Sequence, residues 1–239
     1  MRKYHEVWKL EIRPDEDPPN PIADAFYTSK MICWHREYTL GDDHSFADPD
    51  DFREKITEEN HVICPLFMFD HSGISLSITP FSCPWDSGQV GFVYVSKDDL
   101  HGPTIGESWR ARAMRTIRSE VEDYSAFVAG EVFGYTLYQG LNKQGEPFLR
   151  PVNGPHELHE IEWDAWEYDD SCWGFYGHDA AKENILSSMP DKVRLALEEE
   201  PNIDMYGDTV VWVPAENPPV EKKELSTTRL RGGQLPKEA

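Results

Sequence analysis

Residues 61–96 read HVICPLFMFDHSGISLSITPFSCPWDSGQVGFVYVS, and this stretch decides the fold class of the chain. Two strand-like segments lie at its start, and the turn formers at 70–73 between them predict a β-hairpin, because Gly73 tolerates a positive φ. Along the second segment apolar and hydroxyl-bearing residues alternate, so one face of that strand turns to the core and the other stays polar. A third strand follows at 89–96, in which Gly91 marks a β-bulge or a close approach of another backbone.

One long amphipathic helix is predicted after this stretch. Thr104 and Glu107 form a capping box at its start, and Gly130 suits its end. Between them one stripe of residues recurs every three or four positions, which is the spacing of a helix that packs on a core. The stripe consists of Arg110, Met114, Ile117, Val121, Tyr124 and Val128. Three arginines on the flank either pair with nearby carboxylates or clamp an anionic ligand; they are Arg112, Arg115 and Arg118.

The rest of the chain predicts further strands and short helices. Strands are expected at 4–13, 25–36 and 208–214, a hairpin over 131–150 that turns near 142–145, and helices that begin at Asp48, at Asp179 and at the Ser188–Asp191 box. The acid-rich residues 156–170 fit a strand or a helix. Together these elements predict an α+β fold: a single domain over 1–215, in which a mostly antiparallel sheet packs against the long helix and several short helices, and a disordered tail at 216–239.

Composition limits the kinds of partner. The 239 residues carry a formal net charge of −21, which argues against direct binding of nucleic acid and leaves two interpretations: solubility, or imitation of a polyanion. The start of the chain does not resemble a signal peptide, and no apolar stretch approaches the roughly 20 residues that cross a bilayer, so we expect a cytoplasmic protein without a membrane partner. The four cysteines form no CxxC pair, which predicts reduced thiols.

Polar residues gather where the predicted strands end, in the loops at 33–44, 70–73, 82–89 and 169–177. If the strands share one sheet, these loops meet at one edge and build a polar pocket. The candidate catalytic residues are His71, Asp86, Asp70 and Cys83. The candidate ligand-binding residues are His35, Arg36, Ser72, Trp85, Ser87, Gln89, Asp170, Trp173 and Tyr176.

Three chemistries fit such a pocket, although the spacing of its residues specifies no metal and no cofactor. A zinc site would use Cys33 and His35 with His71, Cys83 or Cys172. A nucleophilic site would use Cys83 or Ser87, activated by His71 and oriented by Asp86 or Asp70. An acid/base site would use Asp70, Asp86, Asp169 and Asp170. The alternative is structural, because Asp and Ser side chains in loops often accept hydrogen bonds from backbone N–H groups.

Three motifs carry a resemblance to a known family: PLFMFDHSGISLSITPFSCPWDSGQVGFVYV at 65–95, EVEDYSAFVAGEVFGY at 120–135 and DSCWGFYG at 170–177. They resemble an uncharacterised family of proteins encoded by bacteriophages, plasmids and integrated elements, and the likeness spans 31–177. The site residues given above, with Gly73, Gly88 and Cys172, match the pattern of that family. The resemblance implies a mobile-element setting and no mechanism.

Two functions follow as hypotheses. The first is a phage-type accessory protein whose loop-built pocket binds a small polar or nucleotide-like ligand, with catalysis as an option, in host takeover or counter-defence. The second is an acidic inhibitor or nucleic-acid mimic that blocks a host nucleic-acid-binding protein through its surface. Trp85, Gln89 and the hydroxyl-bearing strand face favour the pocket, because mimicry requires only spaced carboxylates.

Overall fold

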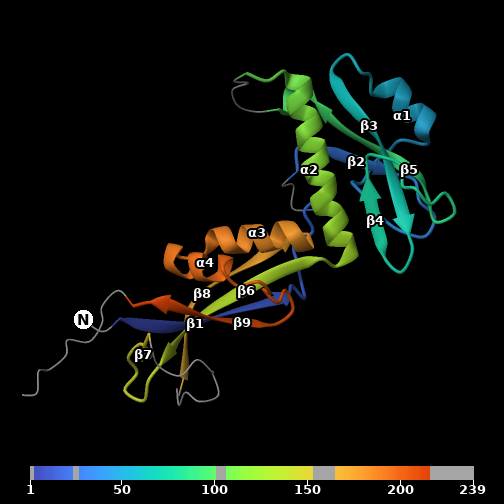
Figure 1. The fold of residues 1–239 in the computed structure, drawn as a ribbon. Helices are drawn as coiled ribbons and strands as arrows, with labels where there is room; N and C mark the ends of the chain where they lie inside the picture. Colours follow the sequence, from blue (N-terminus) through green and yellow to red (C-terminus); the bar gives the residue numbers. More distant parts are fainter. Residues whose placement is uncertain (1–2, 24–26, 101–105, 153–164, 216–239) are drawn as a thin grey trace, which may run out of the picture.

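The strands divide between two antiparallel sheets in the computed structural model, which describes residues 3–23, 27–100, 106–152 and 165–215 (Figure 1). Sheet A contains β1 (Tyr4–Pro14), β6 (Val132–Leu141), β7 (Leu149–Pro151), β8 (Ala165–Tyr176) and β9 (Asp208–Pro214). Sheet B has the order β2-β5-β3-β4, with β2 at Lys30–Cys33, β5 at Ser87–Ser96, β3 at His61–Asp70 and β4 at Ile74–Ser77. The predicted α+β class is confirmed, but the predicted strands form two sheets.

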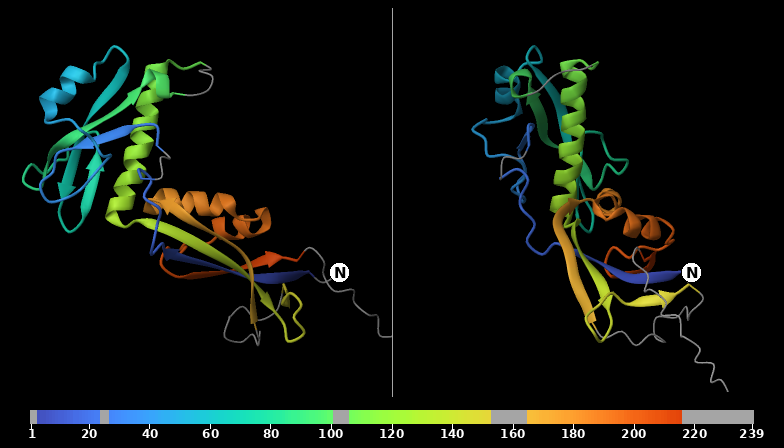
Figure 2. Two further views of the ribbon diagram at one scale, coloured as in Figure 1. Left: turned by 180° about the vertical axis from the view of Figure 1, so that it is seen from behind. Right: turned by 90° about the vertical axis from the view of Figure 1, so that its left-hand side faces the viewer.

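Sheet B packs one face against the long helix α2 (Trp109–Ala129), as Figure 2 shows. Ile117 and Val121 of α2 are buried against Leu66 of β3 and Val93 of β5. The opposite face holds α1 (Pro49–Lys55), whose Phe52 stacks on Phe92 with ring centroids 5.0 Å apart. Aromatic and aliphatic side chains therefore fill both faces of this sheet.

Sheet A is built around β1, which pairs with β9 along one edge and with β6 and β7 along the other. Helices α3 (His178–Ser188) and α4 (Asp191–Glu198) lie on one face, where Leu10, Leu137, Ile185 and Leu197 are fully buried. β8 forms the edge beyond β6, so residues 165–170 of the ambiguous acid-rich stretch are strand. The rest of that stretch, 156–164, lies outside the described residues.

Helix α2 joins the two sheets. Its C-terminal cap Gly130 takes the left-handed conformation at φ 73°, as the sequence predicts, and β6 starts two residues later. The start of α2 differs from the prediction, because Ser108 caps the helix by accepting from the N–H of Ala111, and Thr104 is outside the described residues. No helix in the described part of the chain is both long and apolar enough to cross a membrane.

Other local predictions have mixed outcomes. Asp48 caps α1 as expected, accepting from the N–H groups of Asp50 and Asp51. Ser188 caps no helix, since its hydroxyl donates to the carbonyl of Asn184 in the last turn of α3. The predicted 131–150 hairpin turns where expected, but β7 pairs with β1 rather than along β6. The second strand is shorter than predicted, and the predicted tail at 216–239 is not among the described residues.

Gly91 has both features that its position in a strand predicts. The β3–β5 register shifts between Leu66 and Phe67, opposite Gly91, so β5 carries a bulge there. A Cβ atom on Gly91 would lie 1.9 Å from the carbonyl oxygen of Ile32 in β2. Only glycine permits β2 to approach β5 this closely.

Candidate functional site

The loop that follows β2 folds back on itself and forms a solvent-open hollow of about 570 Å³, here called the loop cavity, lined by residues of 33–44. Asp42 holds the loop to β2: one carboxylate oxygen accepts from the N–H of Met31 and the other from Lys30 Nζ, both at 2.8 Å. The N–H of Gly41 donates to the Tyr124 hydroxyl of α2 at 3.0 Å, and Gly41 itself has φ 78°. The loop is thus fixed to both a strand and the long helix.

Two histidines in this lining have defined hydrogen-bonding roles. His35 Nδ1 accepts from the N–H groups of Glu37 and Tyr38, at 3.3 and 3.2 Å, so a neutral His35 carries its proton on Nε2 and presents a donor there. His44 Nε2 lies 3.0 Å from the carbonyl oxygen of Cys33, which requires the proton on that nitrogen. His44 Nδ1 is then an acceptor, and it is buried without a partner in the structure as described.

Arg36 lines the same cavity. Within the described residues its guanidinium makes no hydrogen bond and no ion pair. Arg36 is exposed to solvent, so its guanidinium is accessible to a ligand. The loop cavity therefore offers the five guanidinium N–H donors and the His35 donor together.

Tyr38 connects the loop cavity to the hairpin between β3 and β4. Its hydroxyl donates to Asp70 Oδ2 at 2.9 Å, and its ring stacks on His35 with centroids 5.1 Å apart. The N–H of Asp70 in turn donates to the carbonyl oxygen of Asp86 at 2.8 Å. Three of the four predicted loops, at 33–44, 70–73 and 82–89, are in this way brought together.

His71, Cys83 and Asp86 form a polar cluster, here called the Asp86 cluster. Asp86 Oδ2 lies 3.4 Å from His71 Nδ1 and accepts from the Cys83 thiol at 3.4 Å. The hydroxyl of Ser87 donates to the Cys83 carbonyl, which closes the turn. Ser72 occupies the left-handed region at φ 63° in the neighbouring hairpin. The cluster is solvent-accessible, with 67% of the His71 side chain exposed.

The fourth predicted loop does not join the others, because β8 pairs with β6 in sheet A. Asp170 accepts from the Tyr135 hydroxyl at 2.9 Å and Tyr176 donates to the carbonyl of Pro19 at 3.0 Å. Trp173 lies across Gly134 of β6. The expectation of one pocket from all four loops is wrong for Asp170, Trp173 and Tyr176, since it assumed a single sheet.

Two further candidates lie apart from the loop cavity. Trp85 is 90% exposed at the tip of its loop and does not line the cavity. Gln89 Nε2 donates to the Gly91 carbonyl at 3.0 Å and borders a smaller hollow of about 210 Å³ with Trp34 and Arg53. Among the helix arginines, Arg115 pairs with Glu107 at 2.8 Å and holds the pKa of that carboxyl below its usual value, which favours the pairing interpretation for this residue.

The described side chains do not assemble the nucleophilic, zinc or acid/base site that the sequence suggests. Asp86 lies between the Cys83 thiol and the His71 imidazole, so the nucleophile–base contact of a catalytic triad is not formed. Burial, with a smaller contribution from Asp42, raises the pKa of the Cys33 thiol to about 12, which keeps it protonated at neutral pH. In the described ranges no three His, Cys, Asp or Glu side chains are arranged to hold a metal ion. Asp169 belongs to β8, as Asp170 does, so the four-carboxylate site is not assembled.

Sequence reasoning missed Tyr38, Asp42 and His44, although all three fall in the polar 33–44 loop that it singled out. Their roles depend on contacts with Asp70, Met31 and Cys33, which local sequence does not reveal. The mobile-element resemblance stays a prediction, since comparison of the chain with models of protein families, with curated proteins and with solved structures finds no significant match.

Proposed function

We propose that the loop cavity binds a small polar ligand that carries an anionic group, of the nucleotide-like class with a phosphate. The observation that carries the proposal is the Arg36 guanidinium, which lines the cavity and has no partner in the described residues. Arginine binds phosphate oxygens through two parallel N–H donors, and the His35 Nε2 donor is suited to a further oxygen.

The same cavity also contains acceptors. Asp43 lines it, and His44 Nδ1 is a buried acceptor without a partner in the residues described. A ligand that satisfies donors and acceptors together carries N–H or O–H groups besides its anion, as the base and ribose of a nucleotide do. A bare inorganic anion would leave the acceptors of the cavity, the Asp43 carboxylate and His44 Nδ1, without a hydrogen-bond donor.

The setting of this proposal rests on the resemblance of the three sequence motifs to mobile-element proteins. A phage-type accessory protein that sequesters a host nucleotide would act in host takeover or counter-defence. The alternative, an acidic mimic, depends on the carboxylates of 156–170, and most of that segment falls outside the described residues. The loop cavity is described, so the ligand-binding proposal is the one argued from side-chain geometry.

Native mass spectrometry of protein purified from its host tests the proposal first, because a retained nucleotide adds a defined mass. Isothermal titration with ATP, GTP, adenosine and inorganic phosphate then measures affinity. We expect a phosphorylated nucleoside to bind more tightly than adenosine or phosphate alone, and Arg36→Ala to weaken binding roughly tenfold or more. The matched control is Arg53→Ala, since Arg53 is exposed on α1 and pairs with Asp50 outside the cavity. Equal binding by Arg36→Ala and the wild type, or no retained mass and no titration signal, would overturn the proposal.

A further inference from the structure

One face of sheet A carries no helix of the described part of the chain. Trp8, Leu10 and Ile12 of β1 are buried toward α3 and α4. The alternate residues point to the opposite face, on which no helix of the described chain packs, as Figures 1 and 2 show. We call this the open face of sheet A.

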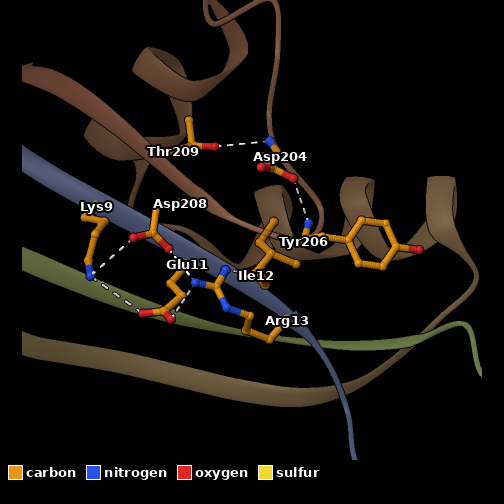
Figure 3. A network of polar contacts seen from close by, with 8 residues as sticks. All are labelled: Lys9, Glu11, Ile12, Arg13, Asp204, Tyr206, Asp208 and Thr209. Atoms are coloured by element: carbon orange, nitrogen blue, oxygen red, sulfur yellow. Dashed lines mark hydrogen bonds and ion pairs between the residues drawn. The ribbon is translucent and has the colours of Figure 1, made fainter.

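Four charged side chains form a balanced network on the open face, across β1 and the start of β9 (Figure 3). Arg13 lies 2.9 Å from Glu11 and 2.8 Å from Asp208, and Lys9 lies 3.6 and 3.8 Å from the same two carboxylates. Two cations and two anions cancel, so the network attracts neither sign of ion strongly. Its side chains are between 17% and 43% exposed, and they place donors beside acceptors, an arrangement that suits hydroxyl groups, which donate and accept.

Aromatic rings border this network on the same face. Tyr168 of β8 stands directly opposite Tyr138 of β6, and Lys9 Nζ lies 4.4 Å from the Tyr138 ring centroid. Trp173 stands opposite Gly134, and a Cβ there would lie 2.0 Å from Trp173 Cε3, so the indole ring lies across the glycine backbone. Tyr168 is 58% exposed and Trp173 is 48% exposed. Their partners on β6 are four residues apart, which separates the two rings by about 13 Å along the strand.

Two bulges in β8 place these rings. The β6–β8 register shifts between Phe133 and Gly134 and again between Leu137 and Tyr138. Bulges re-aim side chains at sheet edges and accompany functional sites. Trp173 covers the backbone of Gly134, and this contact explains its position. The Tyr168 ring covers no such glycine and remains exposed, with its hydroxyl 3.1 Å from Ser171 Oγ.

We propose that the open face of sheet A binds a neutral oligosaccharide. The C–H face of a sugar ring packs on an aromatic plane by dispersion, and its vicinal hydroxyls match paired guanidinium, ammonium and carboxylate groups. Trp173 and Tyr168 supply the planes, and the Lys9–Glu11–Arg13–Asp208 network supplies the polar contacts. The balanced network and the chain's charge of −21 select a neutral ligand over a polyanion. This site is on the other sheet from the loop cavity, so the two proposals succeed or fail separately.

Isothermal titration of the full chain with maltohexaose, cellohexaose, chitohexaose and laminarihexaose tests this inference, with heparin and poly(U) RNA as polyanion probes. We expect at least one neutral hexasaccharide to bind, and Trp173→Ala and Tyr168→Ala each to weaken that binding roughly tenfold. Tyr168→Phe keeps the ring and retains the affinity. Tyr206→Ala is the matched control, since Tyr206 is 60% exposed and its ring packs on Phe133 and His178, outside the open face.

Three results would overturn the inference. None of the four hexasaccharides binds at millimolar concentration; or binding is unchanged in both Trp173→Ala and Tyr168→Ala; or heparin or RNA binds in place of the neutral sugars with an affinity that falls with salt. Tyr168→Ala removes an exposed ring without opening the sheet, so it remains informative if Trp173→Ala does not fold.

Discussion

The Tyr38 hydroxyl donates a hydrogen bond of 2.9 Å to Asp70 Oδ2, and this contact joins the loop after β2 to the end of β3. Tyr38 also stacks on His35, whose Nδ1 accepts from the Tyr38 N–H. One side chain thus links the loop cavity with the hairpin that leads to the Asp86 cluster. The contact joins residues 32 positions apart in the sequence, one of which lines the cavity.

Replacing Tyr38 by Phe keeps the ring stack and removes the hydrogen bond to Asp70. If the contact orders the cavity wall, Tyr38→Phe weakens nucleotide binding by roughly three- to tenfold, measured by isothermal titration with the nucleotide that the wild type binds. The melting temperature should stay close to that of the wild type, because the bond is exposed. Tyr206→Phe, in the turn before β9, is the control, and an unchanged affinity in Tyr38→Phe would show that the wall does not depend on Asp70.

Asp42→Ala removes the acceptor that the buried Met31 N–H uses and the ion-pair partner of Lys30. We expect the free energy of unfolding to fall by about 1–3 kcal/mol, because a buried donor is left unsatisfied. The pKa of Lys30, which the hydrogen bond to Asp42 raises, should move toward its ordinary value. Urea denaturation measures the first effect. Asp43→Ala alters the adjacent exposed carboxylate and should leave stability unchanged, so an equal loss in both variants would contradict the proposed role of Asp42.

Gly91→Ala tests the close approach of β2 to β5. The added methyl group would lie 1.9 Å from the Ile32 carbonyl oxygen, so the two strands must separate. We expect the free energy of unfolding to fall by about 3 kcal/mol. Gly88→Ala lies on the same strand with no atom within 4 Å of the new methyl group, and it should be neutral or slightly stabilising. Similar stability of the two variants in chemical denaturation would exclude the close approach.

Removing the charge of Asp123 should stabilise the folded protein, by an amount that depends on pH. Burial, and then the neighbouring Glu122 and Glu120 carboxylates, raise the pKa of Asp123 above its ordinary value. The folded protein therefore binds this proton more tightly than the unfolded chain, and ionising Asp123 destabilises the fold above its raised pKa. Asp123→Asn should raise the melting temperature at pH 7, and the gain should shrink as the pH falls toward the unfolded value of about 3.9. Thermal unfolding across pH 3–8 measures this, and a gain independent of pH would refute the electrostatic cause.

Much of the local structure was predictable from sequence. The Asp48 cap, the Gly130 end of α2 and the two features of Gly91 follow from backbone chemistry that involves only a few neighbouring residues. The caps assigned to Thr104 and Ser188 were not found, since Ser108 caps α2 and Ser188 bonds back to Asn184. For α2 the sequence offers two hydroxyl-bearing caps, Thr104 and Ser108, and local sequence does not decide between them; α4 starts after Pro190 with no side-chain cap.

The candidate site was only partly predictable. The sequence places His35, Arg36, Asp70 and Asp86 in polar loops, and the structure brings those loops together at one end of sheet B. Asp170, Trp173 and Tyr176 belong to an equally polar segment, yet β8 pairs with β6 in the other sheet. The partner of a strand depends on contacts with segments far away in the sequence. The sequence of a polar loop therefore does not indicate to which sheet its strand belongs.

By itself the sequence determined the α+β class, the positions of most strands and helices, and an acidic chain with polar strand ends. These properties depend on periodicity, capping and charge, which are local or additive along the chain. Only the tertiary structure decided that the strands form two sheets, that Tyr38 reaches Asp70, and that Trp173 and Tyr168 border the same open face as Arg13. Such relations arise from packing between distant segments, where a one-residue change of register or a different strand partner would place the same side chains on another surface.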